Sequence, residues 1–421
     1  MSDVVDRFVR YCEVASQSDP LNAAEVPSTK SQFDIARVIA DDLTELGAAD
    51  VELDDHAYVT AHWPASAGCE DLPCLGFCCH IDTAWQAKGD EVHPRIVHYE
   101  GGPLVMGTVD GHEVSCDPTT NPELDGLAGG DIVTTDGTSL LGGDDKAGDA
   151  EVMSLLARLK ADPSIPHPPL ALSFVPDEEI GHGAALLDLD RWGATWGYTL
   201  DNPGMAEFSY ECFNAAEAKV RATGLSVHTG NAKGIMINAS EAVMRFHQLI
   251  PAQEKPEYTE GYDGFYYVER IEGNCEEALA DYIIRDHDSD RFAARKRLME
   301  NACAYVNELF GTEVLTIEIS DQYRNMADVI SDHMHLVDNA RTAFGDHGYD
   351  MRIVPMRGGT DGAQLCFRGL PCPNLPAGYH NAHGPKEFVP VRELEDMVDV
   401  LQTLVGLYAK PQDDTQTDHQ E

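Results

Sequence analysis

Histidine and carboxylate side chains recur at five places in the chain, in a combination that could bind divalent metal ions. They occur in the segments HID, GGDDK, PDEE, LDN and NAHG, which contain His80 and Asp82, Asp144 and Asp145, Glu178 and Glu179, Asp201, and His383. Imidazole nitrogen and carboxylate oxygen are the ligands of hydrolytic zinc. The set is large enough to hold two ions and to leave one carboxylate as a base. It therefore predicts metal-assisted hydrolysis.

Glu178 and Glu179 are the most informative pair, because they are adjacent acids at the end of an apolar run. Two carboxylates side by side repel each other, so the pKa of one should rise unless cations lie nearby. Adjacent residues at a strand end can point in opposite directions. We therefore assign Glu179 as a metal ligand and Glu178 as the general base that faces the substrate.

His80 and Asp82 are two residues apart, which places both side chains on one face of an extended segment. Asp82 could then accept the second ring N–H of His80 and fix its tautomer. Asp144 follows Gly142 and Gly143, which allow close approach of the backbone; the alternative is that Asp144 caps a helix. With one oxygen for each of two cations, Asp144 could bridge them.

Asp201 and His383 supply the remaining candidate ligands. His380 competes with His383, because both lie in the loop YHNAHGPKEF. The chain has no HExxH, Walker A, complete GxGxxG or GxSxG pattern. Dinucleotide, nucleoside triphosphate and serine-hydrolase sites are therefore not predicted.

The elements that must position these residues alternate between strands and helices. Apolar runs at 72–79, 170–175 and 196–200 read as strands, and helical spacing marks 31–46 and 146–160. Strands separated by helices indicate an α/β fold with a mostly parallel sheet. Ligands bind at the carboxyl ends of the strands in such sheets. His80, the PDEE acids and Asp201 all follow strand-like runs, so they should meet at one edge.

The pattern changes near residue 212, which predicts an inserted domain. Residues 213–228 read as a strand, 233–248 as a helix and 289–310 as a long charged helix. We assign 1–212 and 327–410 to a catalytic domain and 213–326 to an α+β insertion. The catalytic pattern resumes with helix 328–344, strand 351–355 and helix 391–409. The acidic end, 411–421, has almost no apolar content and is expected to be disordered.

The composition excludes several classes of partner. Lys and Arg number 29 against 73 Asp and Glu, so the net charge is −44. Nucleic acid and anionic membranes require clustered basic residues, and we predict neither as a partner. No secretory signal or bilayer-length apolar segment is visible. Eleven cysteines, many in apolar runs, favour a reducing cytoplasm over a disulfide framework.

Five sequence blocks resemble the peptidase T family of bacterial aminotripeptidases, within the co-catalytic dizinc exopeptidases and deacylases. The blocks are HIDT (80–83), TTDGTSLLGGDDKAG (134–148), PDEEIGHGA (176–184), HTGNAKGIMINA (228–239) and RGGTDGAQL (357–365). The likeness runs from DRFVRYCEVASQS to about Lys410. One departure is Thr229, where the family usually has proline after the histidine of the fourth block.

The resemblance implies a dizinc exopeptidase fold with two zinc ions per subunit. His80 and Asp201 would hold one ion, Glu179 and His383 the other, and Asp144 would bridge them. Asp82 would orient His80, and Glu178 would take a proton from a hydroxide shared by the ions and deliver it to the departing amine.

The resemblance also implies that the insertion is a lid and dimerisation domain. Its His228 would reach the active site, and Arg285 and Arg357 are candidates to bind the terminal carboxylate of the substrate. The alternative for Arg357 is a structural ion pair. The expected protein is a cytoplasmic, homodimeric aminotripeptidase. A related dizinc dipeptidase, an N-acyl amino acid deacylase and, more remotely, a non-catalytic binding protein are the other interpretations.

Overall fold

The computed structural model describes residues 2–411 and divides into two compact units. The first unit contains the residues up to Tyr210, Asp328–Val354, and those from Thr360 onward. The second contains Glu211–Ala327 and Pro355–Gly359. The tail that we expected to be disordered, 411–421, lies outside the described residues except for Pro411.

The first unit is built on a mixed sheet with a parallel centre, in the order β1-β2-β8-β3-β9-β16. Strands β8, β3, β9 and β16 run parallel, and β2 pairs antiparallel with β8. The bounds are β1 Ala49–Leu53, β2 Val59–Trp63, β3 Leu75–His80, β8 Leu170–Val175, β9 Trp196–Asn202 and β16 Asn374–Pro376. The mainly parallel α/β fold predicted from the sequence is confirmed.

Helices cover both faces of this sheet, which explains why β3 and β8 are buried along their whole length. Helix α3 packs against β3 and β9, and α4 packs against β8. Trp192 of α4 lies over Gly76 of β3, where a Cβ would come within 2.7 Å of the indole ring. The helices that lie wholly in this unit are α1 Asp3–Cys12, α2 Gln32–Leu46, α3 Gly143–Ala161, α4 Leu189–Trp192, α8 His335–Asp346, α9 Asp361–Phe367 and α10 Val391–Leu407.

Smaller sheets complete the first unit. A three-stranded sheet has the order β17-β7-β4, and two-stranded sheets pair β5 with β6 and β10 with β15. Their bounds are β4 Arg95–Tyr99, β5 Leu104–Val109, β6 His112–Cys116, β7 Gly130–Thr134, β10 Glu207–Phe208, β15 Arg352–Ile353 and β17 Phe388–Pro390. Strand β17 leads directly into α10.

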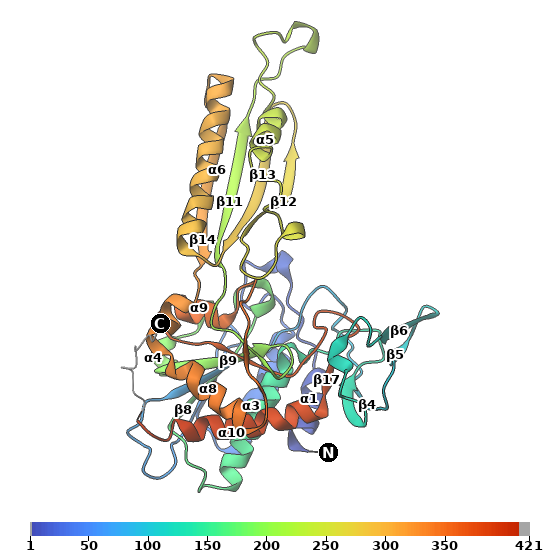
Figure 1. The fold of residues 1–421 in the computed structure, drawn as a ribbon, viewed down its shortest axis with the longest axis vertical. Coiled ribbons are helices and arrows are strands. Elements are labelled where there is room, and N and C mark those ends of the chain that lie inside the picture. Colours follow the sequence, from blue (N-terminus) through green and yellow to red (C-terminus); the bar gives the residue numbers. More distant parts are fainter. Residues whose placement is uncertain (1, 412–421) are drawn as a thin grey trace. The chain divides into compact units, whose positions relative to one another are not determined.

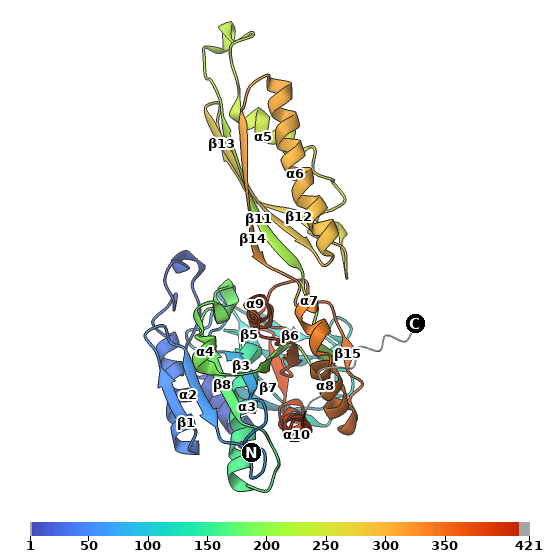
Figure 2. The ribbon, with the colours of Figure 1, turned by 90° about the vertical axis from the view of Figure 1, so that its left-hand side faces the viewer.

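The second unit is an antiparallel sheet with two helices on one face, and α6 runs along the strands (Figures 1 and 2). Its strand order is β12-β13-β11-β14. Alternate residues of β11 and β13 form one buried cluster with Phe246 of α5 and Met299 of α6. The bounds are β11 Asn214–Thr223, α5 Ala239–His247, β12 Phe265–Gly273, β13 Glu277–Asp286, α6 Ser289–Phe310 and β14 Leu315–Tyr323.

Four predicted elements differ clearly from the structure. The strand predicted at 351–355 is reduced to the two residues of β15. The strand predicted at 213–228 ends at Thr223, and Leu225 pairs instead with Ile237 in an isolated antiparallel bridge. The helix predicted at 233–248 begins only at Ala239, where the Asn238 side chain accepts the Glu241 N–H. The helix predicted at 328–344 is broken into α7, Ala327–Ile330, a 3₁₀ turn and α8.

The second unit also contains a segment that the sequence did not suggest. Pro355–Gly359 lies within the stretch assigned to the catalytic domain, yet it belongs to the same compact unit as Glu211–Ala327. Met356 pairs with Cys212 in an isolated parallel bridge, and its N–H donates to Glu211 O. Among residues 2–411, no helix combines the length and apolar character required to cross a membrane.

Candidate metal centre

The residues proposed as metal ligands lie at the carboxyl ends of neighbouring parallel strands. His80 is the last residue of β3, Asp201 is next to last in β9, and Glu179 lies in a 3₁₀ turn, Glu178–Ile180, after β8. Strand β3 lies between β8 and β9 in the sheet. The expected convergence at one edge therefore follows from the strand order.

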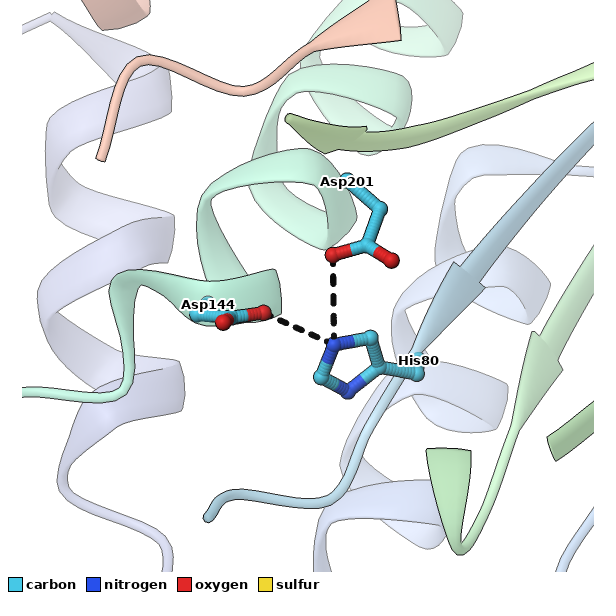
Figure 3. A group of neighbouring side chains, drawn as sticks. All are labelled: His80, Asp144 and Asp201. Carbon is cyan, nitrogen blue, oxygen red and sulfur yellow. Dashed lines mark hydrogen bonds and ion pairs between the residues drawn. The ribbon is translucent and has the colours of Figure 1, made fainter. Parts of the chain in front are cut away.

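His80, Asp144 and Asp201 form one group that could hold a metal ion, with one possible ligand atom from each residue within 4.8 Å of the others. His80 Nε2 lies 2.9 Å from Asp144 Oδ1 and 3.6 Å from Asp201 Oδ1, as Figure 3 shows. The His80 side chain is 1% exposed and the two carboxylates are each 10% exposed. The three polar atoms thus face one another in a nearly buried site.

Asp144, Glu179 and His383 form a second such group. His383 Nε2 lies 3.1 Å from Asp144 Oδ2 and 3.1 Å from Glu179 Oε2. Asp144 contacts the first group through Oδ1 and the second through Oδ2. The structure therefore places one carboxylate oxygen of Asp144 toward each group, as a bridging ligand requires.

The charges in this cluster shift the pKa of each member. Burial raises the pKa of Glu179 to about 7 and that of Asp201 to about 6. Hydrogen bonds to Asp144 and Glu179 raise the pKa of His383 to about 10. For Asp144, burial favours the neutral form, but bonds from His383 and His80 hold its pKa below the usual value. These shifts reflect the attraction between imidazole and carboxylate groups, whose negative charge a divalent cation would also balance.

The donor set fits a pair of divalent metal ions. Each group combines one imidazole nitrogen with two carboxylate oxygens, which are ligands of hydrolytic zinc. Glu179 Oε1 is buried and has no hydrogen-bond partner among the described residues. A buried carboxylate oxygen without a donor is costly, and a cation would satisfy it.

Asp82 contacts both His80 and the turn that carries the paired glutamates. His80 Nδ1 lies 3.1 Å from the Asp82 main-chain oxygen and 3.4 Å from its Oδ1. The Asp82 carboxylate accepts the Glu178 N–H at 3.0 Å and the Glu179 N–H at 3.2 Å. The sequence suggested the first contact and gave no sign of the second, which fixes the backbone of both acids.

Glu178 differs from the proposed ligands in its surroundings. Its carboxylate makes no hydrogen bond or ion pair within the described residues, although its N–H is held by Asp82. Burial, followed by the negative charge of Asp201, raises the pKa of Glu178 well above its usual value. A carboxyl group with a raised pKa and no hydrogen-bond partner of its own suits proton transfer.

Two other side chains hold the ligand segments, and sequence analysis did not identify them. The Asp177 carboxylate accepts the Ser28 N–H at 2.6 Å and the Gln32 amide at 2.6 Å, which ties the turn before Glu178 to the start of α2. The Tyr379 hydroxyl donates to Asp201 O at 3.2 Å. Asp177 lies within the block PDEEIGHGA, but no pattern could have indicated its distant partners.

The two histidines of the loop YHNAHGPKEF contact different partners in the structure. His380 Nε2 lies 3.0 Å from Glu393 Oε2, and its ring stacks on Phe388. His383, with a φ of 64°, directs Nε2 toward Asp144 and Glu179. Of the two, the geometry favours His383 as the ligand.

The three residues predicted to contact substrate all belong to the second unit. His228 is exposed, and its Nδ1 accepts the Gly230 N–H. Arg285 donates to Ala216 O and Ile284 O and stacks over the Tyr323 ring at 5.5 Å. Their role in binding substrate stays a prediction.

Arg357 is held more tightly than the sequence suggested. Its NH1 donates to Gly261 O at 2.8 Å and Asp263 O at 2.9 Å, and its NH2 donates to Thr259 Oγ1 at 2.9 Å. The guanidinium also stacks over Phe213 and Phe265. These contacts are to neutral acceptors and differ from the structural ion pair considered as the alternative. Binding a carboxylate would require Arg357 to exchange some of them.

Comparison with known proteins agrees with the resemblance drawn from the five blocks. Relatives named peptidase T from Geobacillus kaustophilus and Alkaliphilus oremlandii are 42% and 40% identical over 407 and 412 residues. These alignments cover 96% and 97% of this chain and 98% and 100% of the relatives. The resemblance is thereby confirmed.

Solved structures share the fold. An aminopeptidase from Bacillus cereus has a TM-score of 0.75 at 23% identity, and a tripeptidase from Staphylococcus aureus has 0.75 at 19%; each alignment covers 97% of this chain and 98% of the other. A dinuclear metal-binding peptidase from Bacillus subtilis has a TM-score of 0.64 at 12% identity, covering 96% and 97%.

The family model for peptidase family M20/M25/M40 matches residues 142–406, which include Asp144, Glu179, Asp201 and His383. The match extends over more than half of the sequence and includes all of the second unit and part of the first. This chain belongs to peptidase family M20/M25/M40.

Proposed function

We propose that this protein is an aminopeptidase that removes the N-terminal residue from tripeptides, with two zinc ions per subunit. The observation that carries the proposal is the pair of ligand groups that share Asp144, with Glu178 beside them. Relatives named peptidase T at about 40% identity, and the fold shared with a tripeptidase, support the substrate class.

The proposed ligands are His80 and Asp201 for one ion, Glu179 and His383 for the other, and Asp144 for both. The chemistry that two zinc ions supply at such a centre is a lower pKa for water and a polarised scissile carbonyl. The nearly buried setting of these side chains strengthens each electrostatic interaction.

Glu178 is the proposed general base. Its carboxylate accepts a proton from the attacking water and returns it to the departing amine. Asp82 holds the main chain of Glu178 and Glu179 together, so the base and a ligand keep a fixed spacing. Asp82 bonds only to the main-chain N–H groups, so both glutamate side chains are left for other roles. Glu179 can then bind metal while Glu178 transfers the proton.

The second unit supplies the proposed substrate contacts. His228 is assigned to the reacting end of the peptide, and Arg285 and Arg357 to its terminal carboxylate. A guanidinium fork matches a carboxylate in shape and charge.

We also propose that the enzyme is a cytoplasmic homodimer. All eleven cysteines are free thiols, and nine of them are buried, which suits a reducing compartment. The dimer rests on the family resemblance alone. Light scattering coupled to size-exclusion chromatography tests it, and a mass of one chain would contradict it.

The decisive experiment combines a substrate panel with a metal count. Tripeptides, dipeptides, tetrapeptides and N-acyl amino acids are assayed side by side on protein whose zinc is measured by mass spectrometry. We expect the highest kcat/KM for tripeptides and two zinc ions per chain. Preference for dipeptides or acyl amino acids would replace the substrate assignment. Bound zinc without hydrolysis of any substrate would favour a binding protein.

A further inference from the structure

Glu387 is a buried acid that bonds to the segment containing Asp144. It is 1% exposed and lies four residues after His383, directly before β17. Its Oε2 accepts the Leu141 N–H at 2.8 Å and the Gly142 N–H at 2.8 Å, and its Oε1 accepts the Asp144 N–H at 3.1 Å. Both carboxylate oxygens are therefore used to hold one short stretch of main chain.

The local backbone is shaped around this carboxylate. Gly142 has a φ of 81°, a conformation that glycine adopts without strain. At Gly143, a Cβ would lie 3.1 Å from Glu387 Oε1 and 2.8 Å from Val389 Cγ2. The two glycines thus allow the main-chain N–H groups to reach the buried acid.

Glu387 is itself fixed on its other side. Its main-chain oxygen accepts the Thr134 hydroxyl at 2.9 Å, and its N–H donates to Gly384 O at 3.2 Å. The next residue, Phe388, pairs with Thr134 between β17 and β7. The acid therefore connects the 141–144 segment to the segment that carries His383.

We propose that Glu387 is a positioning residue for the metal centre, which sets Asp144 at its distance from His383 by holding the 141–144 main chain. The inference rests on the proposed function, because Asp144 is there the ligand common to both ions. Three main-chain N–H groups donate to this one buried carboxyl group, and together they define the segment closely. Loss of this anchor should weaken both metal sites together.

The test is Glu387→Gln, which keeps the size of the side chain and replaces one acceptor oxygen with an NH₂ donor. That donor must face at least one main-chain N–H of the 141–144 segment. We expect zinc affinity at both sites to fall by about 10–100-fold, the usual effect of changing a residue that orients ligands. Zinc affinity is measured by competition with a chelator, and the melting temperature of the metal-free protein is measured in parallel.

Two variants provide the comparison. Glu151→Gln removes another fully buried acid, whose oxygens have no hydrogen-bond partner among the described residues, and should leave zinc affinity unchanged. Glu179→Gln alters one proposed ligand of a single group and should weaken one ion only. A purely structural role for Glu387 would lower the melting temperature of the metal-free protein without changing zinc affinity.

The outcomes separate this inference from the proposed function. Wild-type protein that binds two zinc ions, with a Glu387→Gln variant that matches it or loses only one, would overturn the inference alone. Wild-type protein that binds no metal would overturn both. If Glu387→Gln does not fold, Thr134→Val removes only the hydroxyl that holds the Glu387 main chain. It should weaken both sites by about 2–10-fold, the value of one hydrogen bond, and unchanged affinity would overturn the inference.

Discussion

At the scale of single residues, two adjacent glutamates differ because their carboxylates meet different neighbours. The Glu179 carboxylate pairs with the His383 ring, whereas the Glu178 carboxylate makes no ion pair within the described residues. Their main-chain N–H groups share one anchor, Asp82. The division into a ligand and a base therefore comes from side-chain direction and needs no difference in residue type.

Replacing Glu178 tests this division directly. Glu178→Gln keeps the side-chain shape but removes the proton acceptor, so we expect kcat to fall by about 10²–10⁴-fold. Zinc content should stay at two ions per chain, because Glu178 is assigned no metal bond. Steady-state kinetics and mass spectrometry measure both quantities.

Glu300→Gln is the matched control, since Glu300 is an exposed acid on α6. It should change neither kcat nor zinc content. Loss of one zinc ion from Glu178→Gln, with substantial turnover left, would exchange the roles of the two glutamates.

Sequence patterns identified the acids and histidines of the centre but not the residues that hold their main chain. His80, Asp144, Glu179, Asp201 and His383 occur in recognisable blocks. Glu387, Asp177 and Tyr379 act through bonds to segments far away in sequence. Such partners are defined only by the folded chain, so residue type and spacing carry no signal for them.

At the scale of elements, apolar runs predicted the three central strands β8, β3 and β9, and helical spacing predicted the long helices. The strand at 170–175 and the helix at 289–310 have the predicted bounds. Errors occur where turns interrupt an apolar pattern, as at Ser331–His333 between α7 and α8. Ser and Asp side chains compete for backbone hydrogen bonds and disfavour helix interiors, which explains this break.

Helix α3 contains an acid that makes stability depend on pH. Burial, followed by the charge of Glu393, raises the pKa of Glu151 well above its usual value. The folded state thus binds this proton more tightly than the unfolded state, whose Glu pKa is about 4.3. The free energy of unfolding should therefore fall as pH rises above about 4.3, by up to about 1.4 kcal/mol per pH unit.

Glu151→Gln removes this titration, because an amide stays neutral. The free energy of unfolding of the wild type should decline more steeply between pH 5 and pH 8 than that of the variant. Urea titrations at several pH values measure both slopes. Other groups titrate equally in the two proteins and cancel in the difference, so parallel slopes would contradict a buried neutral Glu151.

At the scale of the whole molecule, the proposed chemistry draws on both units. The proposed ligands and base belong to the first unit, and His228, Arg285 and Arg357 belong to the second. The proposed ligands and base are therefore complete within the first unit. Sequence could suggest the insertion from a change of pattern, but it could not show that Pro355–Gly359 joins the second unit.

His228→Ala tests the contribution of the second unit. We expect kcat to fall by about 10²–10³-fold, as for the loss of one group that stabilises the transition state, while zinc affinity stays unchanged. The control is His56→Ala, which alters an exposed histidine of the first unit. Unchanged kinetics in His228→Ala would remove this residue from the site.

The net charge of −44 affects the stability of the folded chain as a whole. Folding brings like charges closer together, and their repulsion opposes the compact state. Salt screens this repulsion, because the Debye length falls from about 30 Å at 0.01 M to about 10 Å at 0.1 M. We therefore expect the melting temperature to rise between 0.01 M and 0.15 M salt, and less steeply above that.

Sodium chloride and choline chloride at equal ionic strength should give the same rise, since screening depends on ionic strength and not on the cation. A melting temperature that is constant, or that rises with sodium alone, would show that general screening of the acidic surface is not the cause.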